Sequence, residues 1–283
     1  MPMRDPLAVL WSQLQRWKID PSLRVPAEWR RRGDVLDRLE ATGFQADPML
    51  FQQSEDLRAE LEDIHGAFCA SLREAIRSGR GADALAALPS PSTAGEAPHG
   101  DDYDALDTLI AQVLAVDAPS ADIGVLRPGM VFYQPTPARH LFALLRRLDL
   151  RESDVLIDLG SGLGHLPLLA AILTPATCLG VELEPAYVAS ARLSAEALAL
   201  ERVRFIADDA RAADLSTGTV FYLYSPFTGA MLADMLAILA RHARTRPMRV
   251  ITLGPCTHPV ANVTWLRTDE AVRGDVPVLF HSR

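Results

Sequence analysis

The residues Val155-Leu-Ile-Asp-Leu-Gly-Ser-Gly-Leu-Gly-His165 decide the fold. Their first part, Val155 to Leu159, is a short apolar run with one internal charge, Asp158, and is typical of a strand buried on both faces. Three glycines follow within five residues, which allows a sharp turn and a close approach of a ligand to the backbone. Leucine and isoleucine then recur at helical spacing. The stretch therefore predicts a strand, a glycine-rich turn and a helix.

Two kinds of nucleotide cofactor use such a turn, and the glycine spacing separates them. A dinucleotide requires Gly-x-Gly-x-x-Gly, in which the third glycine packs the helix against the strand. Here His165 stands at that third position, and the last glycine comes one residue early, at Gly164. A second acid, Glu182, follows at the distance where a carboxylate can accept hydrogen bonds from ribose hydroxyls, about 20 residues on. Because His165 stands where a dinucleotide site requires its third glycine, a dinucleotide oxidoreductase is the disfavoured alternative.

An acid directly before Gly-x-Gly-x-Gly, with a second acid ending the next strand, resembles the class I S-adenosylmethionine-dependent methyltransferases. Within this class, the turn Asp158-Leu-Gly-Ser-Gly-Leu-Gly164 and the strand Gly180-Val-Glu182 are most similar to the non-SET histone-lysine methyltransferases and related bacterial proteins. The resemblance covers Met130 to Arg283. It implies an α/β fold, a doubly wound, Rossmann-like sheet of seven strands closed by an antiparallel hairpin, and S-adenosyl-L-methionine as cofactor.

The rest of the chain divides by composition. Residues 1–88 predict a helical N-terminal region, residues 89–102 are rich in Pro, Ser, Gly and Ala and predict a linker, and residues 103–283 form the expected methyltransferase domain. A net charge of −8 argues against a general nucleic-acid binder. The three cysteines are widely separated, match no metal-site spacing and favour the cytoplasm, and no run is long enough to cross a membrane.

The cofactor-binding residues are predicted from three segments. Thr136-Pro137 has the pattern of a helix N-cap, and a helix N-terminus can bind the carboxylate of the cofactor's methionine end; the alternative is a purely capping role. The resemblance implies the turn itself, ribose binding by Glu182, and adenine binding by Asp209, which the alternative interpretation makes a helix cap. The predicted set is Tyr133, Gln134, Thr136, Asp158, Gly160, Ser161, Gly162, Gly164, Glu182 and Asp209.

The acceptor is expected beyond the fourth strand, because ligands of open α/β sheets lie outside the carboxyl ends of the strands. Tyr224-Ser225-Pro226-Phe227 resembles a shortened form of the polar-Pro-Pro-aromatic segment of amino-group methyltransferases. On this interpretation Tyr224 or Ser225 orients the acceptor and Phe227 forms a wall. The alternative is an ordinary strand end and helix cap.

Three functional hypotheses follow. The favoured one is a methyltransferase acting on an amine, with protein lysine included, ahead of O- or N-methylation of a small metabolite. The others are a non-catalytic cofactor-binding scaffold and the dinucleotide oxidoreductase. His165 and His258 are the candidate general bases, and the sequence gives neither a partner. The acceptor, protein or small molecule, and the oligomeric state leave no readable motif.

Overall fold

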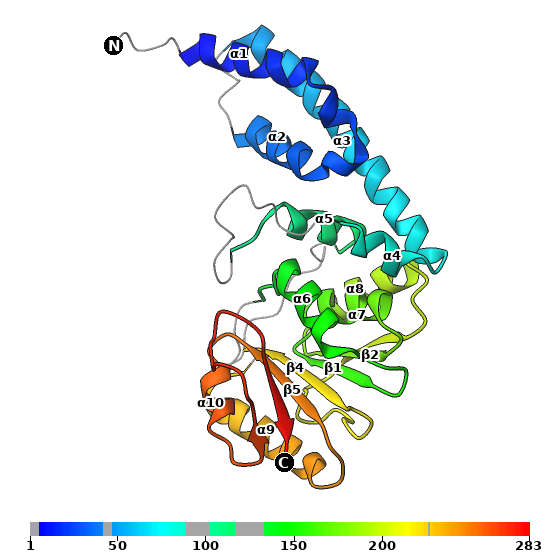
Figure 1. Ribbon diagram of the computed structural model, residues 1–283, viewed down its shortest axis with the longest axis vertical. Coiled ribbons are helices and arrows are strands. Elements are labelled where there is room, and N and C mark those ends of the chain that lie inside the picture. The colour runs from blue at the N-terminus through cyan, green and yellow to red at the C-terminus, as the bar shows by residue number, and fades with distance from the viewer. Residues whose placement is uncertain (1–5, 42–46, 89–101, 117–132, 226) are drawn as a thin grey trace. The chain divides into compact units, whose positions relative to one another are not determined.

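The computed structural model describes residues 6–41, 47–88, 102–116, 133–225 and 227–283 (Figure 1). Contacts divide the chain into two compact units, Met1–Leu72 and Arg73–Arg283, and the division falls inside the long helix α3 (Pro48–Arg77). The end of this helix and α4 (Gly81–Ala86) belong to the second unit, where Gly81 lies against Ile172. This division differs from the predicted one at residue 88. The predicted linker lies almost wholly outside the described residues.

The first unit is helical, as its composition predicts. It contains α1 (Pro6–Ile19), the short 3-10 helices η1 (Pro21–Arg24) and η2 (Pro26–Glu28), α2 (Trp29–Ala41) and most of α3. Leucines and one valine from these helices form its core: Leu14, Leu23, Val35, Leu39, Leu50, Leu57 and Leu61. One cation is also buried here. The Arg32 guanidinium donates hydrogen bonds to the carbonyl oxygens of Leu23 and Val25.

The second unit is built on one sheet of seven strands in the order β3-β2-β1-β4-β5-β7-β6. The strands are β1 (Val155–Leu159), β2 (Thr177–Glu182), β3 (Val203–Ala207), β4 (Val220–Tyr224), β5 (Arg249–Leu253), β6 (Leu266–Arg267) and β7 (Val278–Ser282). The first five are parallel, and β7 pairs antiparallel with both β5 and β6. The predicted doubly wound sheet and its closing antiparallel hairpin are therefore confirmed.

Helices cover both faces of this sheet (Figure 1). They are α6 (Ala138–Leu148), α7 (His165–Leu173), α8 (Pro185–Ala197), α9 (Gly229–Ala243) and α10 (Thr257–Ala261), and α5 (Ala105–Val113) packs against α6. The strand order reverses between β1 and β4, so the crevice for a ligand is expected at their carboxyl ends. Among the helices that the structure describes, none is long and apolar enough to cross a membrane.

Candidate functional site

The turn between β1 and α7 has the backbone that its glycines predict. Gly160, Gly162 and Gly164 all have positive φ angles, of 88°, 51° and 85°, which side-chain-bearing residues rarely adopt. At Gly162 the space is also restricted, because a Cβ atom would lie 2.0 Å from Cε2 of Tyr133. The backbone N–H groups of Gly160 and Ser161 donate to the carbonyl oxygen of Val181 in β2. The turn is thus closely packed and held by the neighbouring strand.

Glu182 at the end of β2 reaches this turn. Its carboxylate is 9% exposed; Oε2 accepts a hydrogen bond from the N–H of Gly162 at 2.9 Å, and Oε1 accepts one from the N–H of Glu184 at 2.9 Å. The structure therefore brings together the two halves of the sequence motif. Each carboxylate oxygen keeps further capacity to accept, as a ribose diol would require.

Asp158, beside Glu182, is a buried acid in an unusual position. It is 5% exposed, and none of the described residues donates a hydrogen bond to its carboxylate. Burial in the first place, and the negative charge of Glu182 in the second, raise its pKa to about 8. The hydroxyl of Ser161 is likewise buried without a partner among the described residues. Two unsatisfied polar groups beside a glycine turn fit a ligand that supplies a cation and hydrogen bonds.

Tyr133 covers the other side of the turn. Its hydroxyl lies 3.0 Å from Nδ1 of His165, the first residue of α7, and its ring lies 5.1 Å from that of Tyr187. Burial lowers the pKa of His165 to about 4, so the imidazole is neutral near pH 7, and an unprotonated Nδ1 accepts from the tyrosine hydroxyl. This pair fixes the Tyr133 ring against Gly162.

Thr136 does not cap a helix, so the N-cap pattern of Thr136-Pro137, and with it the alternative of a purely capping role, is wrong, while its place in the cofactor set stays a prediction. Helix α6 begins at Ala138, its N-cap is Pro137, and no side chain caps it. The Ala138 N–H donates instead to Oδ1 of Asp107 at 2.6 Å. The Thr136 hydroxyl lies 2.8 Å from that of Tyr222 in β4, a residue that pairs in register with Asp158. The hydroxyl therefore bonds to a residue of the sheet and not to the end of the helix. Gln134 nearby is exposed.

Asp209 follows β3 and begins no helix. Its carboxylate accepts from the backbone N–H of Arg211 at 2.9 Å and forms an ion pair with the guanidinium of the same residue at 2.7 Å. Asp208 in turn accepts from the N–H of Asp209. The two acids therefore order a turn, and adenine binding by Asp209 stays a prediction.

The segment after β4 differs most from expectation. Ser225 adopts a positive φ of 41°, and its hydroxyl donates to the carbonyl oxygen of Leu253 and accepts from the N–H of Cys256, both at 3.0 Å. Phe227 is 7% exposed and belongs to the core beneath α9, so its role as an acceptor wall stays a prediction. Pro226 lies outside the described residues. Tyr224 is half-buried at the strand end.

Sequence reasoning missed three contributors to this site, namely Tyr222, Tyr187 and the Tyr133–His165 pair. Tyr222 could have been found from strand alternation, since it occupies the same face of the sheet as Asp158. The contacts of Tyr133 join segments distant in sequence, and no local pattern indicates them.

Comparison with known proteins agrees with this geometry. The family model "Histone methylation protein DOT1" matches residues 131–218, which include the glycine turn, Glu182 and Asp209. No curated protein matches the chain.

Three similar solved structures are described by their sequence identity, the share of each chain covered and the TM-score. An RNA methyltransferase from Salinibacter ruber in complex with S-adenosyl-L-homocysteine is 28% identical, over 53% of this chain and 92% of its own, with a TM-score of 0.43. The putative methyltransferase yhhF from Escherichia coli is 17% identical over 56% and 90%, with a TM-score of 0.43. A SAM dependent methyltransferase from Aquifex aeolicus is 17% identical over 50% and 88%, with a TM-score of 0.41.

The sheet order, the acid-bearing glycine turn and the family match therefore identify the chain as a class I S-adenosylmethionine-dependent methyltransferase.

Proposed function

We propose that this enzyme transfers the methyl group of S-adenosylmethionine to an amine nitrogen, and that the side chain of a protein lysine is its acceptor. The observation that carries the proposal is the match of residues 131–218 to a histone methylation family. The matched segment contains the glycine turn, Asp158 and Glu182, so the likeness includes the candidate site.

Different residues around the turn would bind different parts of the cofactor. Asp158 is buried with no donor among the described residues, and the ammonium of the cofactor's methionine end would supply a positive charge beside it. Ser161, whose hydroxyl has no partner within the described part of the chain, would bind the same end. Glu182 would accept hydrogen bonds from the ribose hydroxyls, Tyr133, Gln134 and Thr136 would border the methionine end, and Asp209 would border the adenine. Gly160, Gly162 and Gly164 allow the backbone to approach the cofactor closely.

The chemistry places modest demands on the protein. The cofactor supplies a methyl group on a sulfonium, which is already a good leaving group. The residues must hold the acceptor nitrogen in line with the methyl–sulfur bond and exclude water. Tyr224 orients the acceptor, since the hydroxyl of Ser225 is already engaged by two backbone groups. His165 is buried, neutral and bonded to Tyr133, so it takes no proton from the acceptor.

A transfer assay with labelled donor tests this proposal. The full-length protein is incubated with core histones and, in parallel, with the same histones after chemical acetylation of their lysines. The expected result is label in methyl-lysine of the unmodified sample, none in the acetylated sample, and reduced label with Tyr224→Phe at unchanged cofactor affinity. Label confined to added small-molecule amines or hydroxylated compounds would contradict the lysine assignment. Cofactor binding without transfer to any of these would favour the non-catalytic scaffold.

A further inference from the structure

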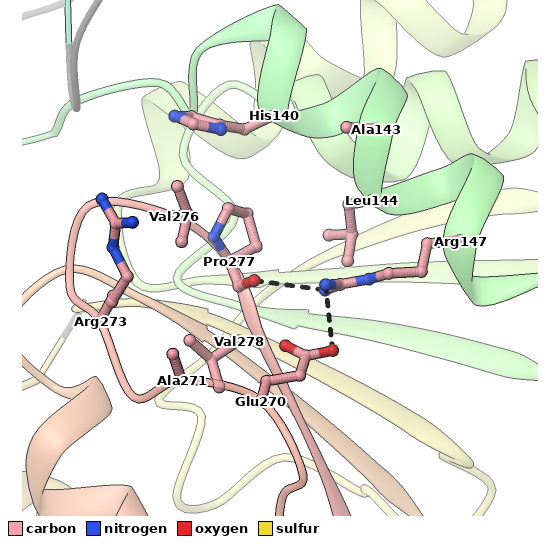
Figure 2. Close-up of a pocket in the computed structure, with 10 residues that line it drawn as sticks. All are labelled: His140, Ala143, Leu144, Arg147, Glu270, Ala271, Arg273, Val276, Pro277 and Val278. Atoms are coloured by element: carbon pink, nitrogen blue, oxygen red, sulfur yellow. Dashed lines mark hydrogen bonds and ion pairs between the residues drawn. The ribbon is translucent and has the colours of Figure 1, made fainter.

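A pocket of about 520 Å³ lies between α6 and the chain that leads from β6 into β7 (Figure 2). Helix α6 contributes His140, Ala143, Leu144 and Arg147, and the segment before β7 contributes Glu270, Ala271, Arg273, Val276, Pro277 and Val278. None of these residues belongs to the cofactor or acceptor set above. The volume is within the range of small-molecule sites, about 300–1,000 Å³.

One end of the pocket is held in place by the protein itself. The Arg147 guanidinium forms an ion pair with Oε1 of Glu270 at 3.0 Å and donates to the carbonyl oxygen of Pro277 at 3.2 Å (Figure 2). The second oxygen of Glu270 accepts from the N–H of Leu279 at 3.0 Å. These bonds fix the segment on α6 before any ligand binds. Binding therefore costs little conformational entropy in this part of the chain.

The middle of the pocket is apolar. Leu144 faces it from α6, and Val276 and Pro277 face it from the opposite segment (Figure 2). Ala143 leaves room beside Leu144, since its side chain is a single methyl group. An aromatic or aliphatic body of moderate size can therefore pack there.

The other end of the pocket carries guanidinium donors. Arg273 lies there with His140, away from the Arg147–Glu270 pair (Figure 2). Two N–H groups of Arg273 donate to Asp275, and a guanidinium has five in all, so donors remain for a ligand. The lining carries two arginines and one glutamate, and Asp275, which pairs with Arg273, brings the formal charge of this group to zero. The oxygens of both acids are already bonded, whereas Arg273 keeps N–H groups that no described residue accepts from, so a ligand with a carboxylate finds better partners here than a cation does.

We propose that this pocket binds a small amphipathic carboxylate, with its apolar body against Leu144 and Val276 and its carboxylate on Arg273.

The pocket wall is joined to the acceptor side of the sheet, because the Gly254 N–H at the end of β5 donates to the carbonyl oxygen of Gly274 at 2.8 Å. Gly254 adjoins Ser225, since a Cβ on it would lie 2.6 Å from the serine hydroxyl oxygen. The inference does not depend on which acceptor the enzyme methylates.

Calorimetric titration of the full-length protein tests the proposal with three probes of one shape. These are 3-phenylpropionate, the neutral 3-phenylpropanol and the cationic 3-phenylpropylamine. The expected result is saturable binding of the carboxylate, about tenfold tighter than that of the other two probes, the gain of one charge-assisted hydrogen-bonded pair.

Two variants locate the binding. Arg273→Gln should weaken carboxylate binding about tenfold and leave alcohol binding unchanged, because it removes the charge and keeps a polar side chain. Ala143→Phe, at an exposed helical position, should abolish binding by filling the space. The matched controls are Arg244→Gln and Ala237→Phe, at exposed positions outside the pocket, and both should bind like the parent.

The proposal is overturned if no probe binds saturably, if the amine or the alcohol binds as tightly as the carboxylate, or if Ala143→Phe binds unchanged. Unaltered circular dichroism and cofactor affinity in the variants exclude misfolding as the cause of a loss. These readouts require no methyl transfer, so their failure is separate from failure of the proposed reaction.

Discussion

Replacing Gly162 with alanine tests the packing of the glycine turn. The backbone there has a φ of 51°, and the new Cβ would lie 2.0 Å from Cε2 of Tyr133, a distance that no side chain tolerates. The Tyr133 ring must therefore move, which breaks its hydrogen bond to His165 and its contact with Tyr187. Where the ring moves toward the turn's open side, it enters the proposed cofactor site.

The magnitude follows from three contributions. A Cβ in the left-handed region costs about 1–2 kcal/mol. Loss of the Tyr133–His165 hydrogen bond costs about 1 kcal/mol. Loss of the aromatic pair costs about 0.5–1.5 kcal/mol. Gly162→Ala should thus lower the free energy of unfolding by about 2.5–4.5 kcal/mol in total.

Gly229→Ala is a matched control, because Gly229 has a φ of 55° and nothing lies within 4 Å of its added Cβ. It should show the backbone cost alone, about 1–2 kcal/mol, and leave cofactor binding unchanged. Urea unfolding followed by circular dichroism measures the first quantity, and calorimetry with S-adenosylhomocysteine the second. Equal destabilisation by the two variants, or equal cofactor affinity, would refute the reasoning.

Three further predictions concern the acids and the strand end. Glu182→Ala should abolish S-adenosylhomocysteine binding measured by calorimetry, because it removes the acceptor of the Gly162 N–H as well as the proposed ribose partner; undiminished binding would show that the ribose site lies elsewhere. Asp158 has a raised pKa of about 8, so its contribution to stability is complete below its unfolded pKa of about 4 and is lost as pH rises through about 8. Urea midpoints should fall across this window in the free protein, and Asp158→Asn should flatten the fall; a variant with the parent's profile would contradict the assignment. Ser225→Ala should destabilise the protein by about 1–3 kcal/mol, because the buried N–H of Cys256 loses its acceptor, and an unchanged urea midpoint would count against that role.

Much of the fold was predictable because its signals are local. The apolar run with one acid, the three glycines and the helical spacing after them lie within one short stretch, and the structure contains the strand, turn and helix that they predict. The acid Glu182 was also predictable, since parallel neighbouring strands bring their carboxyl ends to one edge.

The errors arose where a distant partner decided the outcome. Thr136-Pro137 has the local pattern of a helix cap, yet the threonine hydroxyl bonds to Tyr222, 86 residues away. Phe227 could face either side of the sheet edge, and in the structure it packs into the core beneath α9. The pocket could not be predicted from the sequence for the same reason. Arg147 and Pro277, which are hydrogen-bonded across it, are 130 residues apart.

The cytoplasmic location and the predicted linker stay predictions. The three cysteines, Cys69, Cys178 and Cys256, are buried and form no disulfide. Burial raises the pKa of the Cys256 thiol, which packs in the core as a small apolar side chain does.

Calorimetric titration of the protein with S-adenosylhomocysteine, with NADH run in parallel, tests the central claim most directly. The account predicts binding of S-adenosylhomocysteine at micromolar concentration and no binding of NADH, because His165 stands where a dinucleotide site requires glycine. Binding of NADH alone would contradict the account at the turn on which the whole fold is organised.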